Sequence, residues 1–165
     1  MTSTTRNPFT PVSLLMTFAL TVLGTLLLMA LSNLATGHAH IRYETPPFAL
    51  ALHLATVIPA LPLGAWVLWS QKGDARHKMM GRVWAVLMLI TAITSFWLRE
   101  ISGGLSPIHI FSVMTLFSIP RGIWLARQGR IAAHKRAMVS PYIGLFVAGL
   151  FAFVPGRLLG TLAFG

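Results

Sequence analysis

The sequence predicts an all-α transmembrane helix bundle of about five spans, built from a duplicated helical hairpin plus an N-terminal helix. Three observations predict it: hydrophobic types make up 55% of the 165 residues, charged types make up only 10%, and the apolar residues fall into long runs. A soluble domain carries about 25% charged residues, so this chain has too little polar surface for a water-soluble globule. At roughly 20 apolar residues per span, no separate soluble domain fits.

Polar or turn-forming residues bound each apolar run. Residues 1–12 form a short polar tail. The first run, 13–35, is longer than the apolar core of a cleaved secretory signal, about 7–15 residues, so we expect a retained helix with a cleaved signal as the alternative. The later runs are 48–69, 79–98, 108–126 and 137–162. Their short connections predict antiparallel neighbours in one four-helix domain over residues 48–162.

Lysine and arginine are distributed unevenly between the two ends of these runs. One end carries Arg6, Lys72, Arg76, Lys78, Arg82, Arg127, Arg130, Lys135 and Arg136, and the other carries Arg42, Arg99 and Arg157. Cytoplasmic loops of membrane proteins carry the Lys and Arg excess. We therefore expect a multi-pass protein of the inner (cytoplasmic) membrane, with a cytoplasmic N-terminus and a periplasmic or extracellular C-terminus. The same rule accounts for the net charge of +10 without nucleic-acid binding.

Two hairpins, at residues 48–100 and 105–162, share one order of residues. The first contains His53, Pro62-x-Gly64-x-Trp66, Gly73 and His77-Lys78, and the second contains His109, Pro120-x-Gly122-x-Trp124, Gly129 and His134-Lys135. The two histidines are 24 residues apart in the first hairpin and 25 in the second. We infer an internal duplication, and sites in membrane proteins with repeats often lie between the repeats.

The repeat places four histidines at two levels: His53 with His109 near the outer face, and His77 with His134 at the inner face. Two helices facing each other at one depth can supply both axial imidazoles of a haem iron. The basic residues expected near its propionates are Lys78, Arg82, Lys135 and Arg136 inside, and Arg99 and Arg157 outside. The alternative is solvated histidines. It suits His53 least, because ionisable residues inside a span are usually functional.

Other polar features carry less weight. His38 and His40 lie near Glu44 in an outer loop. Solvated side chains are a simpler interpretation of these residues than a metal site. Arg121 near the inner end of its run is expected to extend to the interface. The sequence has no cysteine, no P-loop and no nucleophile motif, so the catalytic residues stay unassigned.

The stretch from His53 to Arg157 resembles a bacterial multi-pass membrane family of unknown function, DUF2306. The resemblance is carried by His53, His77-Lys78-Met79-Met80-Gly81-Arg82, His109, His134-Lys135-Arg136 and Pro155-Gly156-Arg157. The paired histidines are also similar in pattern to the cytochrome b561 class of transmembrane di-haem proteins. That similarity implies b-type haems, one held by His53 with His109 and one by His77 with His134. The short spacing within each hairpin would put the inner haem at the membrane surface.

The expected function is therefore b-type haem binding with transmembrane electron transfer, as a component of a membrane oxidoreductase. The protein would lie in the lipid bilayer, and its partner would be quinol or a redox protein. A second hypothesis is a non-redox transporter, carrier or assembly partner that uses the histidines for metal or proton binding. A third is a structural bundle with no cofactor.

Overall fold

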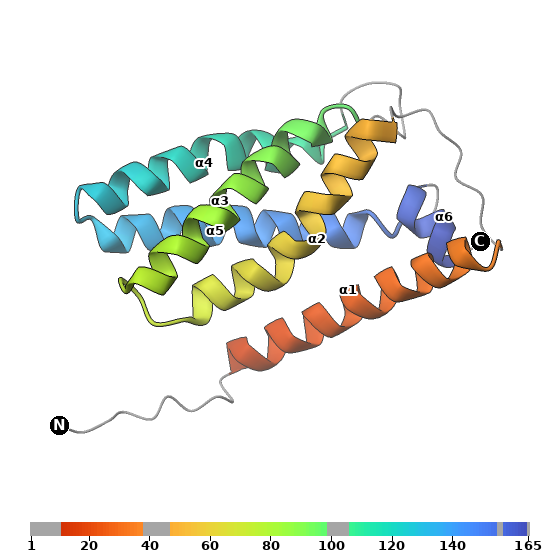
Figure 1. The fold of residues 1–165 in the computed structure, drawn as a ribbon, viewed down its shortest axis with the longest axis horizontal. Helices are drawn as coiled ribbons and strands as arrows, with labels where there is room; N and C mark the ends of the chain where they lie inside the picture. Colours follow the sequence, from red (N-terminus) through yellow and green to blue (C-terminus); the bar gives the residue numbers. More distant parts are fainter. Residues whose placement is uncertain (1–10, 38–46, 99–105, 155–156, 165) are drawn as a thin grey trace.

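The computed structural model describes residues 11–37, 47–98, 106–154 and 157–164, and the regular secondary structure within these ranges is all helical. These ranges contain five long helices and one short helix, arranged as in Figure 1. They are α1 (Pro11–Ala35), α2 (Pro47–Trp69), α3 (Ala75–Ser95), α4 (His109–Arg127), α5 (Ile131–Phe151) and α6 (Leu158–Phe164). The predicted all-α class is confirmed.

Three helices of the described chain are long and apolar enough to cross a membrane: Phe48–Trp69, Ala75–Ser95 and His109–Arg127. These helices confirm the membrane character of the protein. In α1 the side chains are described continuously over Leu20–Asn33, and this segment is apolar. The first turns of α5 contain the basic residues Lys135 and Arg136. Spanning by α1 and α5, and the orientation of the two ends, stay predictions.

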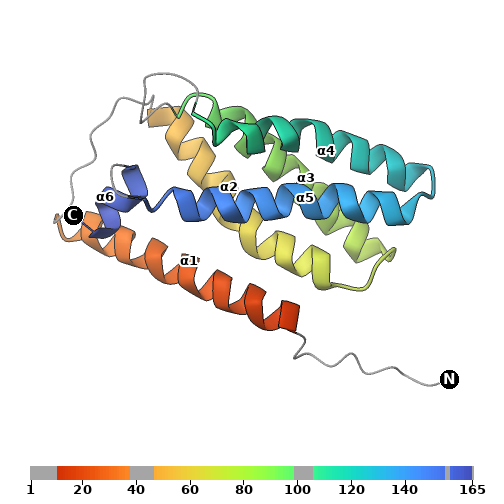
Figure 2. The same cartoon turned by 180° about the vertical axis from the view of Figure 1, so that it is seen from behind.

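The two hairpins lie side by side in one four-helix group. α2 packs against α3 and α4 against α5, while α3–α4 and α2–α5 contacts join the hairpins. α1 lies outside this group, along α6 and against part of α2 (Figures 1 and 2). We call the end that holds the α2–α3 and α4–α5 turns the basic end, and the opposite end the α6 end.

The two turns at the basic end share a backbone feature. Gly73 has a φ of 88° and Gly129 a φ of 73°, in the left-handed region where glycine is tolerated best. After Gly73, the carboxylate of Asp74 accepts a hydrogen bond from the His77 N–H at 2.7 Å and caps α3. Both glycines occupy the same place in the predicted repeat, so the backbone agrees with the duplication at this point.

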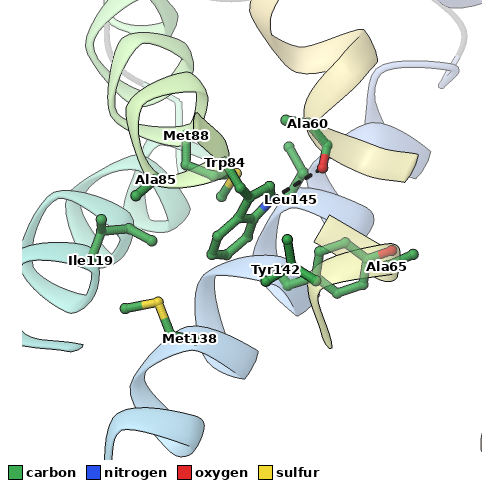
Figure 3. Close-up of a cluster of buried hydrophobic side chains, with 10 residues drawn as sticks. Ala60, Ala65, Trp84, Ala85, Met88, Ile119, Met138, Tyr142 and Leu145 are labelled. Atoms are coloured by element: carbon green, nitrogen blue, oxygen red, sulfur yellow. Dashed lines mark hydrogen bonds between the residues drawn. The ribbon is translucent and has the colours of Figure 1, made fainter. Parts of the chain in front are cut away.

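The core of the four helices is centred on Trp84 of α3 (Figure 3). Trp84 is 1% exposed, and its indole N–H donates to the carbonyl oxygen of Ala60 at 3.1 Å. The Tyr142 ring of α5 lies beside it, with ring centroids 6.4 Å apart. Gly64 allows this close approach, because a Cβ there would lie 2.5 Å from the indole nitrogen. The rest of the cluster is Ala65, Val67, Ala85, Met88, Ile119, Met138 and Leu145.

Threonine hydroxyls inside the helices bond to the carbonyl group of the preceding turn. Such bonds run from Thr56 to Leu52, from Thr94 to Ile90 and from Thr115 to Phe111, at 2.9, 2.8 and 2.7 Å. This back-bonding gives a polar side chain a partner within its own helix. These hydroxyl groups therefore keep a hydrogen-bond partner even in apolar surroundings.

Three helix boundaries differ from those of the apolar runs. α3 begins at Ala75 and α5 at Ile131, ahead of the apolar starts at 79 and 137. Lys and Arg are good helix formers, so the helices extend beyond the apolar segments into the basic ones. The last run is also divided, because α5 ends at Phe151 and α6 begins at Leu158. The helix-breaking pair Pro-Gly lies between them in the sequence.

Candidate functional site

A cavity of about 440 Å³ lies between the helices in the half of the bundle nearer the α6 end. All six helices contribute to its lining, and most of the lining side chains are apolar. Its polar lining residues are His53, Thr91, Ser95, His109, Ser112, Thr115 and Arg157. Small-molecule sites in proteins occupy about 300–1,000 Å³ and combine an apolar wall with a few polar groups, as this cavity does.

Small residues and a bent helix leave this space open. Gly24 of α1, Ala92 of α3 and Ala148 of α5 all line the cavity, and a Cβ added to Gly24 would meet no atom within 4 Å. α2 changes direction about halfway along (Figures 1 and 2), where it contains Pro59 and Pro62. Proline lacks the N–H of a helical hydrogen bond and crowds the preceding turn, which bends the helix.

His53 of α2 has one bonded and one unbonded ring nitrogen. Its Nδ1 lies 3.1 Å from the carbonyl oxygen of Thr91 and 3.0 Å from Oγ1 of Thr94. The carbonyl can only accept, and the Thr94 hydroxyl already donates to Ile90, so Nδ1 carries the proton and donates. Nε2 then holds a lone pair without a hydrogen-bond partner among the described residues. His53 is one of the residues that line the cavity, and its free Nε2 can serve as an acceptor or a metal ligand.

His109, at the start of α4, has both ring nitrogens bonded to backbone. Nε2 lies 3.0 Å from the carbonyl oxygen of Ser95, so it carries the proton and donates. Nδ1 lies 3.0 Å from the backbone nitrogen and 2.9 Å from the carbonyl oxygen of Ser106. The ring is 5% exposed and stacks on Phe96, with centroids 5.6 Å apart. His109 therefore ties the end of α3 to the start of α4.

The structure brings the predicted outer pair to one cavity but gives its two members different bonds. Both histidines bond to the last turns of α3. His53 bonds to Thr91 and Thr94, and His109 bonds to Ser95. Only His53 offers an unbonded nitrogen. Ligation of one iron by His53 and His109 stays a prediction, and it would require one ring nitrogen of His109 to give up its backbone partner.

The predicted inner pair meets at the basic end. His77 of α3 and His134 of α5 are close enough for their charges to interact. Nδ1 of His77 lies 3.3 Å from Oγ of Ser70, and Nδ1 of His134 lies 2.9 Å from the carbonyl oxygen of Gly122. Within the described residues, no group of three or more His, Asp or Glu side chains could hold a metal ion. Haem ligation by this pair also stays a prediction.

A protein-family model described as "Predicted membrane protein (DUF2306)" matches residues 50–163. The chain belongs to this family. The DUF2306 region covers α3 to α5, nearly all of α2 and α6, and it includes all four paired histidines. α1 precedes it. No curated protein and no solved structure matches the sequence. The similarity of pattern to the cytochrome b561 class stays a prediction.

The predicted propionate partners of the DUF2306 region divide between its two ends. Lys78, Arg82, Lys135 and Arg136 are exposed at the basic end. Arg157, before α6, is half-buried, lines the cavity and lies 3.5 Å from Oγ of Ser106 through Nη2. Arg157 is therefore the predicted basic residue that reaches the cavity. Arg99, His38, His40 and Glu44 lie outside the described residues.

Sequence reasoning missed the residues that hold the two histidines. Thr91, Thr94 and Ser95 follow one another at helical spacing on one face of α3, and they supply the oxygen atoms that His53 and His109 contact. Thr91 and Ser95 contact the histidines through backbone carbonyl oxygens, which residue types do not indicate, and Thr94 contacts His53 through its hydroxyl group. Gly24 was also missed, because a single glycine in an apolar run does not indicate a cavity.

Proposed function

We propose that the cavity binds a lipophilic molecule carrying a hydroxyl group, and that quinol is the class of molecule it takes. The observation that carries the proposal is the unbonded Nε2 of His53, a residue that lines a mostly apolar cavity. An apolar wall accepts a ring and chain through the hydrophobic effect. The imidazole Nε2 accepts the hydrogen bond of the hydroxyl group. Such a molecule dissolves in the bilayer that surrounds the protein.

His53 is suited to discriminate among lipophilic molecules. The bond from Nδ1 to Thr91 fixes the tautomer and the orientation of the ring, so Nε2 is always the acceptor. A bound hydroxyl group supplies the missing donor. A ligand without a donor leaves Nε2 unpaired in an apolar site, which costs about 1–3 kcal/mol. The cavity should therefore prefer the quinol over the matching quinone, which has no hydroxyl group.

A b-type haem is the second candidate ligand, and the same nitrogen favours it. Imidazoles that ligate metals usually donate their other ring N–H to a carbonyl or carboxylate group, as His53 does to Thr91. Arg157 at the cavity could pair with a propionate. A haem bound there would supply one-electron transfer. The residues fit one axial ligand as they lie, because both nitrogens of His109 are bonded.

The test is binding of decylbenzoquinol, and of its quinone, to the purified protein in lipid vesicles. We expect the protein to bind the quinol more tightly than the quinone. The variant His53→Ala should lose this preference, because the acceptor is gone. His134→Ala, at the basic end, is the matched control and should keep it. Equal quinol binding by His53→Ala and the wild type would exclude His53 as the acceptor.

The visible absorption spectrum of the same preparations separates the two ligands. Protein produced with ample haem should show a b-type spectrum if the second candidate is right, and His53→Ala should then lose it. A colourless wild-type protein that binds quinol supports the first candidate. A colourless protein that binds neither quinol nor quinone would contradict both.

A further inference from the structure

We propose that α1 completes the cavity and that Gly24 sets the size of the molecule that the cavity accepts. The identity of the ligand rests on the function proposed above, whereas the role of Gly24 depends only on the geometry of the cavity. Four residues of α1 line it: Leu20, Leu23, Gly24 and Leu27. Their spacing of three and four residues places them along one face of the helix. This face is the wall that α1 provides.

Gly24 is the gap in that wall. Its neighbours on the face are leucines, each with a branched side chain, whereas glycine has no side chain. A Cβ built at Gly24 would meet no atom within 4 Å. At Gly64, by contrast, the added Cβ would lie 2.5 Å from Trp84. A side chain at position 24 would thus extend into open space along the cavity.

α1 is held mainly by α6, while Leu20 also packs against the Trp84 core. The side-chain amide of Asn33 donates to the carbonyl oxygens of Leu162 and Ala163 at 2.9 and 3.0 Å. A second hydrophobic cluster joins the two helices and the end of α5, and it consists of Leu23, Ala30, Phe153, Leu162 and Ala163. These contacts lie beside Gly24 without including it. Substitution of Gly24 should therefore leave both clusters intact.

The family match places the two parts of the site on different sides of a boundary. It begins at residue 50, so His53 lies within the DUF2306 region and Gly24 lies before it. The chemistry at His53 thus belongs to the matched region, while α1 supplies the wall that limits ligand size. Changing the wall should alter which molecules bind without altering what His53 recognises.

The experiment is a size series, Gly24→Ala, Gly24→Leu and Gly24→Phe, in full-length protein in vesicles. The probes are decylbenzoquinol and decylbenzene, which has no hydroxyl group. Binding of both probes should fall along the series, by about tenfold or more for Gly24→Phe. Leu28→Phe is the control on the same helix, where the side chain is 68% exposed, and it should bind as the wild type does. Unchanged binding across the series would overturn the proposal.

A second measurement covers the case in which a large side chain prevents folding. The chain has no cysteine, so Gly24→Cys provides a single thiol that can be modified after folding. Attachment of a bulky maleimide at position 24 should block both probes, and attachment at Leu28→Cys should block neither. Blocking at neither position would overturn the proposal.

The two probes also separate this proposal from the function of His53. If His53→Ala leaves quinol binding unchanged while the Gly24 series weakens both probes, the acceptor role fails and the wall stands. If His53→Ala abolishes the preference for quinol while Gly24→Phe changes neither probe, the acceptor role stands and the wall fails.

Discussion

The Nε2 atom of His109 lies 3.0 Å from the carbonyl oxygen of Ser95 and joins the start of α4 to the end of α3. Replacing His109 by alanine should destabilise the protein by about 1–3 kcal/mol, because buried backbone groups lose their partner. Thermal denaturation in detergent measures the change. A variant of unchanged stability that loses a b-type spectrum would instead place His109 on a haem iron.

The hydroxyl group of Thr94 adds a second bond to the ring of His53. In Thr94→Val this oxygen is gone, while the carbonyl oxygen of Thr91 remains. Quinol affinity should fall a few-fold, by less than in His53→Ala, because the ring keeps its main partner. Thr115→Val is the control, since Thr115 lines the cavity and bonds to Phe111 instead of to His53. An equal loss in both variants would mean that cavity polarity matters, and not the ring of His53.

The two glycines at equivalent places in the repeat should tolerate alanine differently. In Gly64→Ala the new Cβ would meet the ring atoms of Trp84 and Tyr142, which are held in the core. In Gly122→Ala it would meet mainly the terminal methyl group of Met138, and methionine is flexible. We expect a loss of about 1–3 kcal/mol for Gly64→Ala and a smaller loss for Gly122→Ala. The reverse order of melting temperatures would contradict the packing around Trp84.

Asn33 should control the attachment of α1. In Asn33→Leu the bonds to Leu162 and Ala163 are lost, while the core around Trp84 is untouched. Amide hydrogen exchange should become faster in α1 and α6 and stay unchanged in α3. The isosteric Asn33→Asp should behave similarly, because a carboxylate cannot donate to carbonyl groups. Faster exchange in α3 would show that α1 also supports the core.

The helices were predictable because long apolar runs leave little choice of structure. Three runs match α1, α2 and α4 closely, at 13–35, 48–69 and 108–126. The starts of α3 and α5 were not predictable from the apolar runs. Such runs mark the part of a helix that lies in lipid, and these two helices begin earlier, in basic residues. The division of the last run was indicated by Pro155 and Gly156, which hydropathy alone does not weigh.

The candidate site was predictable only in outline. Spacing along helices placed His53 and His109 at one level, and both line one cavity. Which ring nitrogen is bonded depends on the rotation of α3 beside them, and no spacing rule supplies this. The cavity depends on small residues from helices far apart in the sequence, such as Gly24 and Ala148. These residues come together only through the packing of the helices, which the sequence pattern does not specify.

The back-bonded threonines bear on how this chain enters its membrane. A helix inserted alone into lipid must satisfy its polar groups by itself, and Thr94 and Thr115 do so through the carbonyl groups of Ile90 and Phe111. These helices can therefore insert before they associate, as in two-stage assembly. Asn33 differs, because its amide group finds its partners on α6. Docking of α1 must then wait until α6 has been made.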